Sequence, residues 1–341
     1  MAGGETVLVT GGSGYIGGWC AATLLQRGYV VRTTVRDLTR EPQVRAAIAK
    51  VVDPGNRLSV YAANLTSDDG WDAAVDGCDY VLHVASPLGV TEPKDPNELI
   101  VPARGGAKRA VGAAIRAGVK RVVLTSSVAA TSRAEAGDWV SDETVWTNGD
   151  DPKVGAYGRS KTLAERAAWA LIEAAGGPTT LAVVNPALVL GPVLSNDLSE
   201  SIQVVERLVT GRVPGLPRLG FNIVDVRDVA DLHIRAMTAP EAAGERFIAA
   251  AHWAWIADVA DVLRAKLDAK AAARVPTRKV PDLLVRLIGL FDKDLGSVTP
   301  DLGRKHDYSS AKAHDLLGWR PRPLEETILD CANSLFAEGV A

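Results

Sequence analysis

The sequence predicts an α/β protein: a Rossmann-type, doubly wound parallel sheet with a smaller, mostly α-helical lobe in the C-terminal part of the chain. Three observations support this fold class. A short apolar run, Val7–Val9, precedes a glycine-rich turn from Gly11 to Gly17 and a helical pattern that ends near Gly28, which is a strand–turn–helix unit. Apolar runs alternate with helical segments up to about residue 190, and prolines break the pattern beyond it.

Each predicted strand is a short apolar run that a segment of helical character separates from the next one. After Val7–Val9 the strands are expected at Val30–Val35, Leu58–Ala62, Tyr80–Ala85, Arg121–Thr125 and Thr180–Val184. Such alternation predicts parallel strands joined by right-handed crossovers and covered by helices on both faces.

The domain boundaries follow from where the regular pattern weakens. We expect residues 1–190 to form the sheet domain, with 222–240 returning to it, and residues 191–221 and 241–341 to form the lobe that binds the substrate. Within the returning segment, Ile223–Met237 is expected to rejoin the main sheet, with Asp228 as a helix cap.

Composition excludes several classes of function. The 341 residues carry a formal net charge of -3, so no nucleic-acid partner is expected. No leader or membrane segment is evident, and three widely spaced cysteines favour a reducing compartment, so a cytoplasmic location is expected. The five histidines lack metal-ligand spacing, which predicts no metal site.

The glycine-rich turn is the first functional motif. Gly12–Gly17 fits G-x-G-x-x-G, and Gly11, Gly14 and Gly17 also fit the variant with wider spacing. Glycines let the chain turn tightly and approach a pyrophosphate, which the N-terminus of the following helix attracts. The turn, including Tyr15 and Ile16, is therefore predicted to bind a dinucleotide.

The residues after the second strand distinguish the two nicotinamide cofactors. An arginine there accommodates a 2'-phosphate, whereas an acidic residue accepts hydrogen bonds from a free ribose hydroxyl. Arg36 directly follows the expected strand end at Val35 and favours NADPH, while a register shift at Asp37 would favour NAD.

Tyr157 and Lys161 are the candidate catalytic pair. Their spacing of four places both side chains on one face of the helix expected over Tyr157–Ala175. A neighbouring ammonium is expected to lower the pKa of the phenol and make it a usable general acid or base. A hydroxyl after the fifth strand, Ser126 or Ser127, would polarise the substrate oxygen.

Four stretches together resemble the extended short-chain dehydrogenase/reductases, and among them the dihydroflavonol-reductase-like aldehyde and ketone reductases. They are Thr10–Gly17, His83–Pro87, Tyr157–Glu165 and Asn185–Pro192. The resemblance implies that Ser127 is the catalytic serine, with Ser126 as the alternative. It also implies that Lys161 holds the nicotinamide ribose, and it adds a set of cofactor contacts: Asn64 and Leu65 at the adenine, Ala85 and Ser86 in the cofactor groove, and Pro186 to Val189 beside the nicotinamide.

Two departures from that group bear on the substrate. Ser132 or a neighbour stands where the plant flavonoid reductases carry an asparagine, and Ala156–Arg159 lacks the cysteine-containing motif of cinnamoyl-CoA reductases. Neither a flavonoid nor a CoA thioester is therefore expected.

The sequence thus predicts NADPH-dependent reduction of a small aldehyde or ketone to the alcohol, with Ser127, Tyr157 and Lys161 as the catalytic residues. Two alternatives stay open: an NAD-dependent sugar-nucleotide epimerase or dehydratase, and a regulator that senses NADP(H) without chemistry. Monomer and homodimer are both compatible with the sequence.

Overall fold

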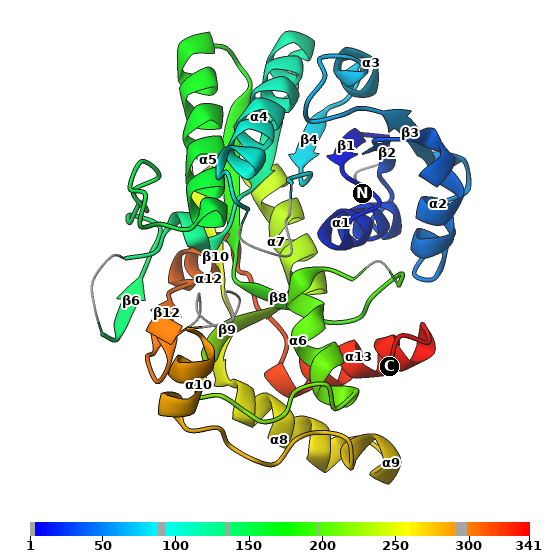
Figure 1. The fold of residues 1–341 in the computed structure, drawn as a ribbon. Helices are drawn as coiled ribbons and strands as arrows, with labels where there is room; N and C mark the ends of the chain where they lie inside the picture. The colour runs from blue at the N-terminus through cyan, green and yellow to red at the C-terminus, as the bar shows by residue number, and fades with distance from the viewer. Residues whose placement is uncertain (1–3, 88–92, 134–136, 197, 291–298) are drawn as a thin grey trace.

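A computed structural model describes residues 4–87, 93–133, 137–196, 198–290 and 299–341. Its centre is a parallel sheet to which the described residues contribute seven strands, in the order β10-β7-β5-β4-β1-β2-β3 (Figure 1). The strands are β1 Thr6–Thr10, β2 Val30–Val35, β3 Leu58–Ala62, β4 Tyr80–His83, β5 Arg121–Thr125, β7 Thr180–Pro186 and β10 Arg246–Ala249.

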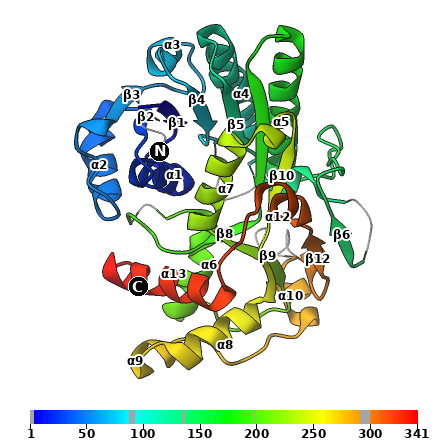
Figure 2. The same cartoon turned by 180° about the vertical axis from the view of Figure 1, so that it is seen from behind.

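Helices cover both faces of this sheet, which explains why its strands are almost continuously apolar. Helices α4 and α5 lie side by side on one face (Figure 1), and α7 and α1 pack against each other on the opposite face (Figure 2). The helices of this part are α1 Tyr15–Gln26, α2 Glu41–Ala49, α3 Trp71–Val75, α4 Asn97–Ala117, α5 Ala156–Ala175 and α7 Val226–Thr238.

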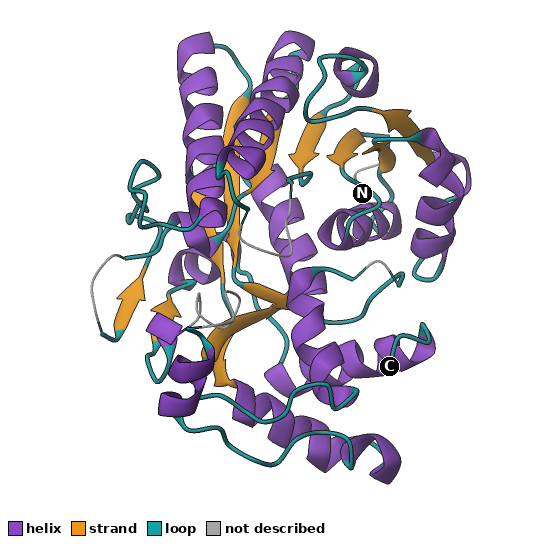
Figure 3. Cartoon of the chain, viewed as in Figure 1, coloured by secondary structure: helices purple, strands orange, loops and turns teal. Residues whose placement is uncertain are grey.

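The second lobe combines short strands with helices (Figure 3). A sheet of order β11-β9-β8 lies next to the main sheet, and β12 pairs with β6. These strands are β6 Trp139–Ser141, β8 Leu188–Leu190, β9 Gly220–Asp225, β11 His252–Trp255 and β12 His306–Tyr308. The remaining helices are α6 Glu200–Val209, α8 Ile256–Lys266, α9 Ala269–Ala272, α10 Asp282–Ile288, α12 Ala311–Leu317 and α13 Leu324–Ala337.

The segment 222–240, which was predicted to return to the main sheet, is divided between the two sheets. The expectation that its strand rejoins the main sheet is wrong, because β9 pairs with β8 and β11 in the small sheet, and only α7 packs on the main sheet. Asp225, not Asp228, caps α7 by accepting a hydrogen bond from the Arg227 amide. The range 241–341 in turn supplies an edge strand to the main sheet, since β10 pairs with β7.

The topology brings the carboxyl ends of the strands to one edge of the main sheet. The strand order reverses between β1 and β4, and open α/β sheets bind ligands at such a switch point. Thr10 and His83, the last residues of these two strands, are paired in register and hydrogen-bonded through Oγ1 and Nδ1 at 2.9 Å.

Among the residues that the structure describes, no helix is both long and apolar enough to cross a membrane. Within the same ranges, no group of three or more His, Cys, Asp or Glu side chains is arranged to hold a metal ion.

Candidate active site

The turn between β1 and α1 has the geometry that the glycine motif predicted. Gly11 has φ of +75°, and its amide donates to Thr34 Oγ1 at 3.1 Å. A Cβ on Gly12 would lie 2.0 Å from Thr33 Oγ1, and a Cβ on Gly17 would lie 2.3 Å from the Gly11 carbonyl oxygen. A side chain is therefore excluded at Gly12 and at Gly17, and α1 begins at Tyr15 without a side-chain cap on its first amides.

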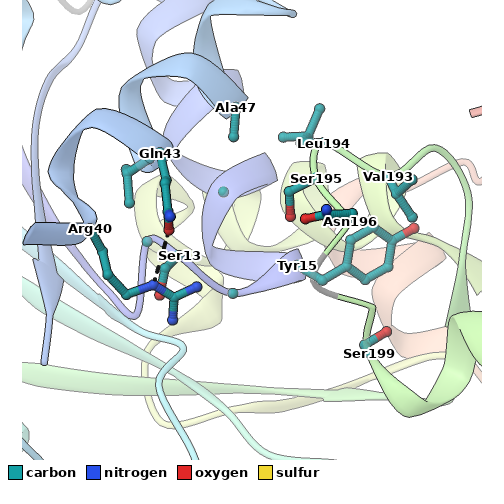
Figure 4. Close-up of a pocket in the computed structure, with 14 residues that line it drawn as sticks. Ser13, Tyr15, Arg40, Gln43, Ala47, Val193, Leu194, Ser195, Asn196 and Ser199 are labelled. Atoms are coloured by element: carbon teal, nitrogen blue, oxygen red, sulfur yellow. Dashed lines mark hydrogen bonds between the residues drawn. The ribbon is translucent and has the colours of Figure 1, made fainter. Parts of the chain in front are cut away.

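A pocket of about 330 Å³ adjoins this turn (Figure 4). It is lined by three parts of the chain: the turn with the start of α1, Arg40 with one side of α2, and the segment after Pro192, which is far from the other two in sequence. Tyr15 and Trp19 of α1 hold that segment in place by donating to the carbonyls of Gly191 at 2.9 Å and Pro192 at 2.8 Å. The sequence offered no motif for this wall, since only the fold brings it to the glycine turn.

Three residues that follow β2, Arg36, Asp37 and Arg40, have different surroundings in the structure. Arg36 is exposed directly beyond the strand end. Asp37 caps a 3₁₀ turn, η1 Leu38–Arg40, by accepting from the Thr39 amide at 2.9 Å, and this hydrogen bond lowers the pKa of Asp37. Arg40 lines the pocket beside the turn (Figure 4). Arg40 was not among the residues predicted to contact the cofactor, because the fold and not a sequence motif brings it to the glycine turn.

The residues that the resemblance assigns to the cofactor differ in position: some line a pocket, and others are buried outside the pockets. Ala85 packs against the glycine turn, because a Cβ on Gly11 would lie 3.1 Å from it, and Ala85 and Ser86 line a second, smaller pocket. Pro186 ends β7 and Val189 belongs to β8, both buried and outside the two pockets.

Asn64 and Leu65 follow β3 and also lie outside both pockets. The Asn64 Oδ1 atom accepts from the Thr66 amide at 3.1 Å, and Leu65 packs closely against Gly106 of α4. The described structure therefore uses both residues in local packing at the edge of the sheet.

Three side chains predicted to be catalytic come together at the carboxyl ends of β5 and the start of α5. The Ser127 hydroxyl is close enough to the Tyr157 hydroxyl to act on it as a hydrogen-bond partner and to lower the pKa of the phenol. The Lys161 Nζ atom lies 5.8 Å from the centroid of the Tyr157 ring. Ser126 instead faces the second pocket, with its Oγ buried and without a partner among the described residues. The geometry thus places Ser127 and not Ser126 against the phenol.

The electrostatics differ from the expectation that Lys161 lowers the pKa of the phenol. Burial raises the pKa of Tyr157, and the hydrogen bond from Ser127 only partly offsets this. Lys161 is itself buried, which lowers its pKa to about 8, with Glu165 acting in the opposite direction. Because the Lys161 amine lies over the ring and is desolvated, it does not lower the pKa of the phenol, and the expected direction of the shift was wrong.

A network of buried polar side chains links the segments that carry the three catalytic candidates. Glu165, one turn after Lys161, pairs with Arg246 of β10 at 2.6 Å. Asn185 of β7 donates both to Glu165 Oε2 and to the carbonyl of Ser127, each at 3.1 Å. These links join the catalytic helix to the loop that carries Ser127. No sequence motif indicated this pair, because Glu165 and Arg246 are 81 residues apart and only the fold brings them together.

The fold and this group of side chains define an extended short-chain dehydrogenase/reductase. A model of the NAD dependent epimerase/dehydratase family matches residues 7–250, and the chain belongs to that family. Both the fold class and the resemblance predicted from sequence are confirmed.

The chain is also similar to individual proteins of this kind. The chain is 40% identical over 250 residues to cinnamoyl-CoA reductase 1 of Arabidopsis thaliana, covering 72% of this chain and 70% of the relative. It is 35% identical to dihydroflavonol 4-reductase of Zea mays, covering 94% and 85%. The crystal structure of yeast methylglyoxal/isovaleraldehyde reductase complexed with NADPH superposes with a TM-score of 0.81, at 27% identity and covering 99% of this chain and 100% of that one.

Proposed function

We propose that this protein reduces an aldehyde or ketone to the alcohol with NADPH. The observation that carries the proposal is the grouping of Ser127, Tyr157 and Lys161 at the sheet edge where the glycine turn lies, with Lys161 Nζ 5.8 Å from the centroid of the Tyr157 ring and Ser127 acting on the phenol. The reductase names of its relatives and the NADPH in the yeast structure support the same reaction class.

The residues fit this cofactor. A Cβ on Gly11, Gly14 or Gly17 would lie 3.1, 3.3 or 2.3 Å from a neighbouring protein atom, so the tight turn requires glycine. The turn places the amides of Tyr15 and Ile16 at the start of α1, which suits a pyrophosphate. The adenosine 2'-phosphate would meet Arg36 and Arg40. The Asp37 carboxylate accepts a hydrogen bond from the Thr39 amide, which argues against a role for Asp37 in binding the ribose of NAD. Further contacts are assigned as the sequence predicted: Asn64, Leu65, Ala85, Ser86, Lys161, Pro186 and Val189.

NADPH, when bound, supplies the hydride that reaches the carbonyl carbon. Ser127 donates a hydrogen bond to the carbonyl oxygen, and Tyr157 transfers its phenolic proton to that oxygen as charge develops on it. The raised pKa keeps Tyr157 protonated at neutral pH, which suits an acid in the reductive direction. Lys161 would hold the nicotinamide ribose and stabilise the phenolate left behind.

Replacing Tyr157 with Phe tests the proposal. Loss of a positioned acid should lower kcat by roughly 10²- to 10⁴-fold while NADPH affinity, measured by fluorescence titration, stays unchanged. Tyr61→Phe is the matched control, because Tyr61 lies in β3, away from the catalytic group. Unchanged turnover in Tyr157→Phe would rule the mechanism out.

The alternative epimerase or dehydratase reaction has the family model's description in its favour. Such an enzyme would retain NAD through purification, so the absorption spectrum and the nucleotide released on denaturation distinguish the two. A regulator without chemistry would bind NADPH but oxidise none of it across a panel of aldehydes, aryl ketones, β-ketoesters and hydroxysteroids.

The cysteines bear on the compartment that we propose for the protein. Cys20, Cys78 and Cys331 are buried free thiols, and burial raises their pKa values to about 12, 11 and 12. They suit a reducing, cytoplasmic location. Ser132 is hydrogen-bonded to the Tyr308 hydroxyl at 2.9 Å. From the sequence departures alone, neither a flavonoid nor a CoA thioester is the expected substrate, a prediction that the names of the relatives do not support.

A further inference from the structure

The start of α6 carries two side-chain oxygens that nothing in the described structure satisfies. Ser199 Oγ and Glu200 Oε1 are both enclosed and have no hydrogen-bond partner among the described residues. A buried polar atom without a partner is costly, and a buried carboxylate oxygen more so than a hydroxyl. Such groups in native proteins call for a specific explanation.

Their position is between the two functional regions of the site. Ser199 lines the pocket next to the glycine turn (Figure 4). Glu200, its neighbour, acts on the Tyr157 hydroxyl strongly enough to help raise the pKa of that phenol. The Glu200 carboxylate is therefore within electrostatic reach of the atom that would donate a proton to the substrate.

A purely structural role does not account for Glu200. As the first residue of α6 it lies at the positive end of the helix dipole, but no backbone amide there donates to Oε1. Burial raises its pKa, and no cation opposes that effect. Glu206 of the same helix and Glu165 of α5 are more deeply buried than the half-buried Glu200, and each has an arginine partner, at 2.8 Å and 2.6 Å. The enclosed Oε1 atom of Glu200 has no such countergroup among the described residues.

We infer that Glu200 is a specificity residue that binds a hydrogen-bond donor of the substrate, a hydroxyl or a protonated amine close to the carbonyl group. The missing partner of the carboxylate would then arrive with the substrate, while Ser127 and Tyr157 bind the carbonyl oxygen. This inference rests on the proposed reductase function. It narrows the substrate class to hydroxy- or amino-substituted aldehydes and ketones.

A site built to bind a donor discriminates strongly against analogues that lack it, because the site's own polar group is left unpaired. A hydrogen bond to a charged group corresponds to a preference of roughly 10- to 100-fold in kcat/KM. Suitable pairs are 2-hydroxyacetophenone against its methyl ether, 3-hydroxypropiophenone against its methyl ether, and protonated 2-aminoacetophenone against acetophenone.

The experiment measures NADPH oxidation with these pairs for the wild type, Glu200→Ala, Glu200→Gln and a control, Glu173→Gln. Glu173 is an exposed carboxylate near the end of α5. We expect the wild type and the control to prefer the donor-bearing ketones, and Glu200→Ala to lose the preference. Glu200→Gln should keep part of the preference for hydroxyls, because its amide oxygen still accepts, and lose the preference for the ammonium.

The result separates the two proposals. A wild-type ratio near one for every pair overturns the role of Glu200, whatever the variants do. A ratio that stays the same in Glu200→Ala also overturns it. If no carbonyl compound is reduced with NADPH at all, the reductase proposal and the inference that rests on it both fail.

Discussion

The buried pair of Glu165 and Arg246 makes a quantitative prediction about stability. Glu165 is 0% and Arg246 6% exposed, so neither charge has access to water. In Glu165→Gln the shape of the side chain is kept and the guanidinium loses its countercharge. Removing one partner of a buried ion pair costs roughly 3–5 kcal/mol, because the other charge stays buried without compensation.

The surroundings of Arg246 place the expected cost at the lower end of that range. Its Nη1 still donates to the carbonyls of Glu143 and Val145, both at 2.9 Å, and the guanidinium lies 3.7 Å from the centroid of the Trp146 ring. We therefore expect Glu165→Gln to lower the free energy of unfolding by about 3 kcal/mol. With a urea dependence of roughly 3 kcal/mol per molar, the midpoint falls by about 1 M.

The assay is urea denaturation followed by tryptophan fluorescence, and an exposed ion pair is the control. Arg116 and Asp72 lie 2.6 Å apart with side chains 62% and 75% exposed. Asp72→Asn should change the free energy of unfolding by no more than about 1 kcal/mol. If Glu165→Gln shifts the midpoint no further than Asp72→Asn does, the argument that burial makes this pair indispensable is wrong.

Three further predictions concern the cofactor turn and Lys161. Arg36→Ala should raise KM for NADPH and leave KM for NADH nearly unchanged, as steady-state kinetics with both cofactors would detect. Gly17→Ala should abolish NADPH binding in a fluorescence titration, since its Cβ would lie 2.3 Å from the Gly11 carbonyl oxygen. Lys161→Met should abolish turnover but raise the urea midpoint at pH 7, because burial lowers the pKa of Lys161 to about 8 from 10.5 and the charged form destabilises the fold.

The pH dependence of the Lys161 effect provides its own check. Between pH 8 and 10.5 the unfolded state binds more protons at Lys161 than the folded state, so the stability of the wild type rises with pH in this window. The gain in Lys161→Met is therefore fully present below pH 8 and disappears towards pH 10.5. A gain that is independent of pH would contradict the assignment to a buried ammonium. Equal loss of NADPH and NADH in Arg36→Ala would likewise show that Arg36 does not read the 2'-phosphate.

Much of the fold was predictable because it depends on short-range patterns. The strands at Val30–Val35, Leu58–Ala62 and Arg121–Thr125 have the predicted bounds in the structure. Continuous apolar runs between helical segments are compatible with a parallel sheet covered on both faces and with little else. The edge strand Arg246–Ala249 escaped prediction, since it begins with a buried charge whose partner, Glu165, is distant in the sequence.

The sequence by itself determined the glycine turn and the Tyr157–Lys161 face, since backbone sterics and helical periodicity act over a few residues. Only the tertiary structure decided which serine meets the phenol, that burial raises the pKa of Tyr157, and that Glu200, which acts on this phenol, has no partner for its Oε1 atom in the described part of the chain. Desolvation and charge pairing depend on which distant segments exclude water together. A pattern along the chain does not encode those distances until the chain is folded.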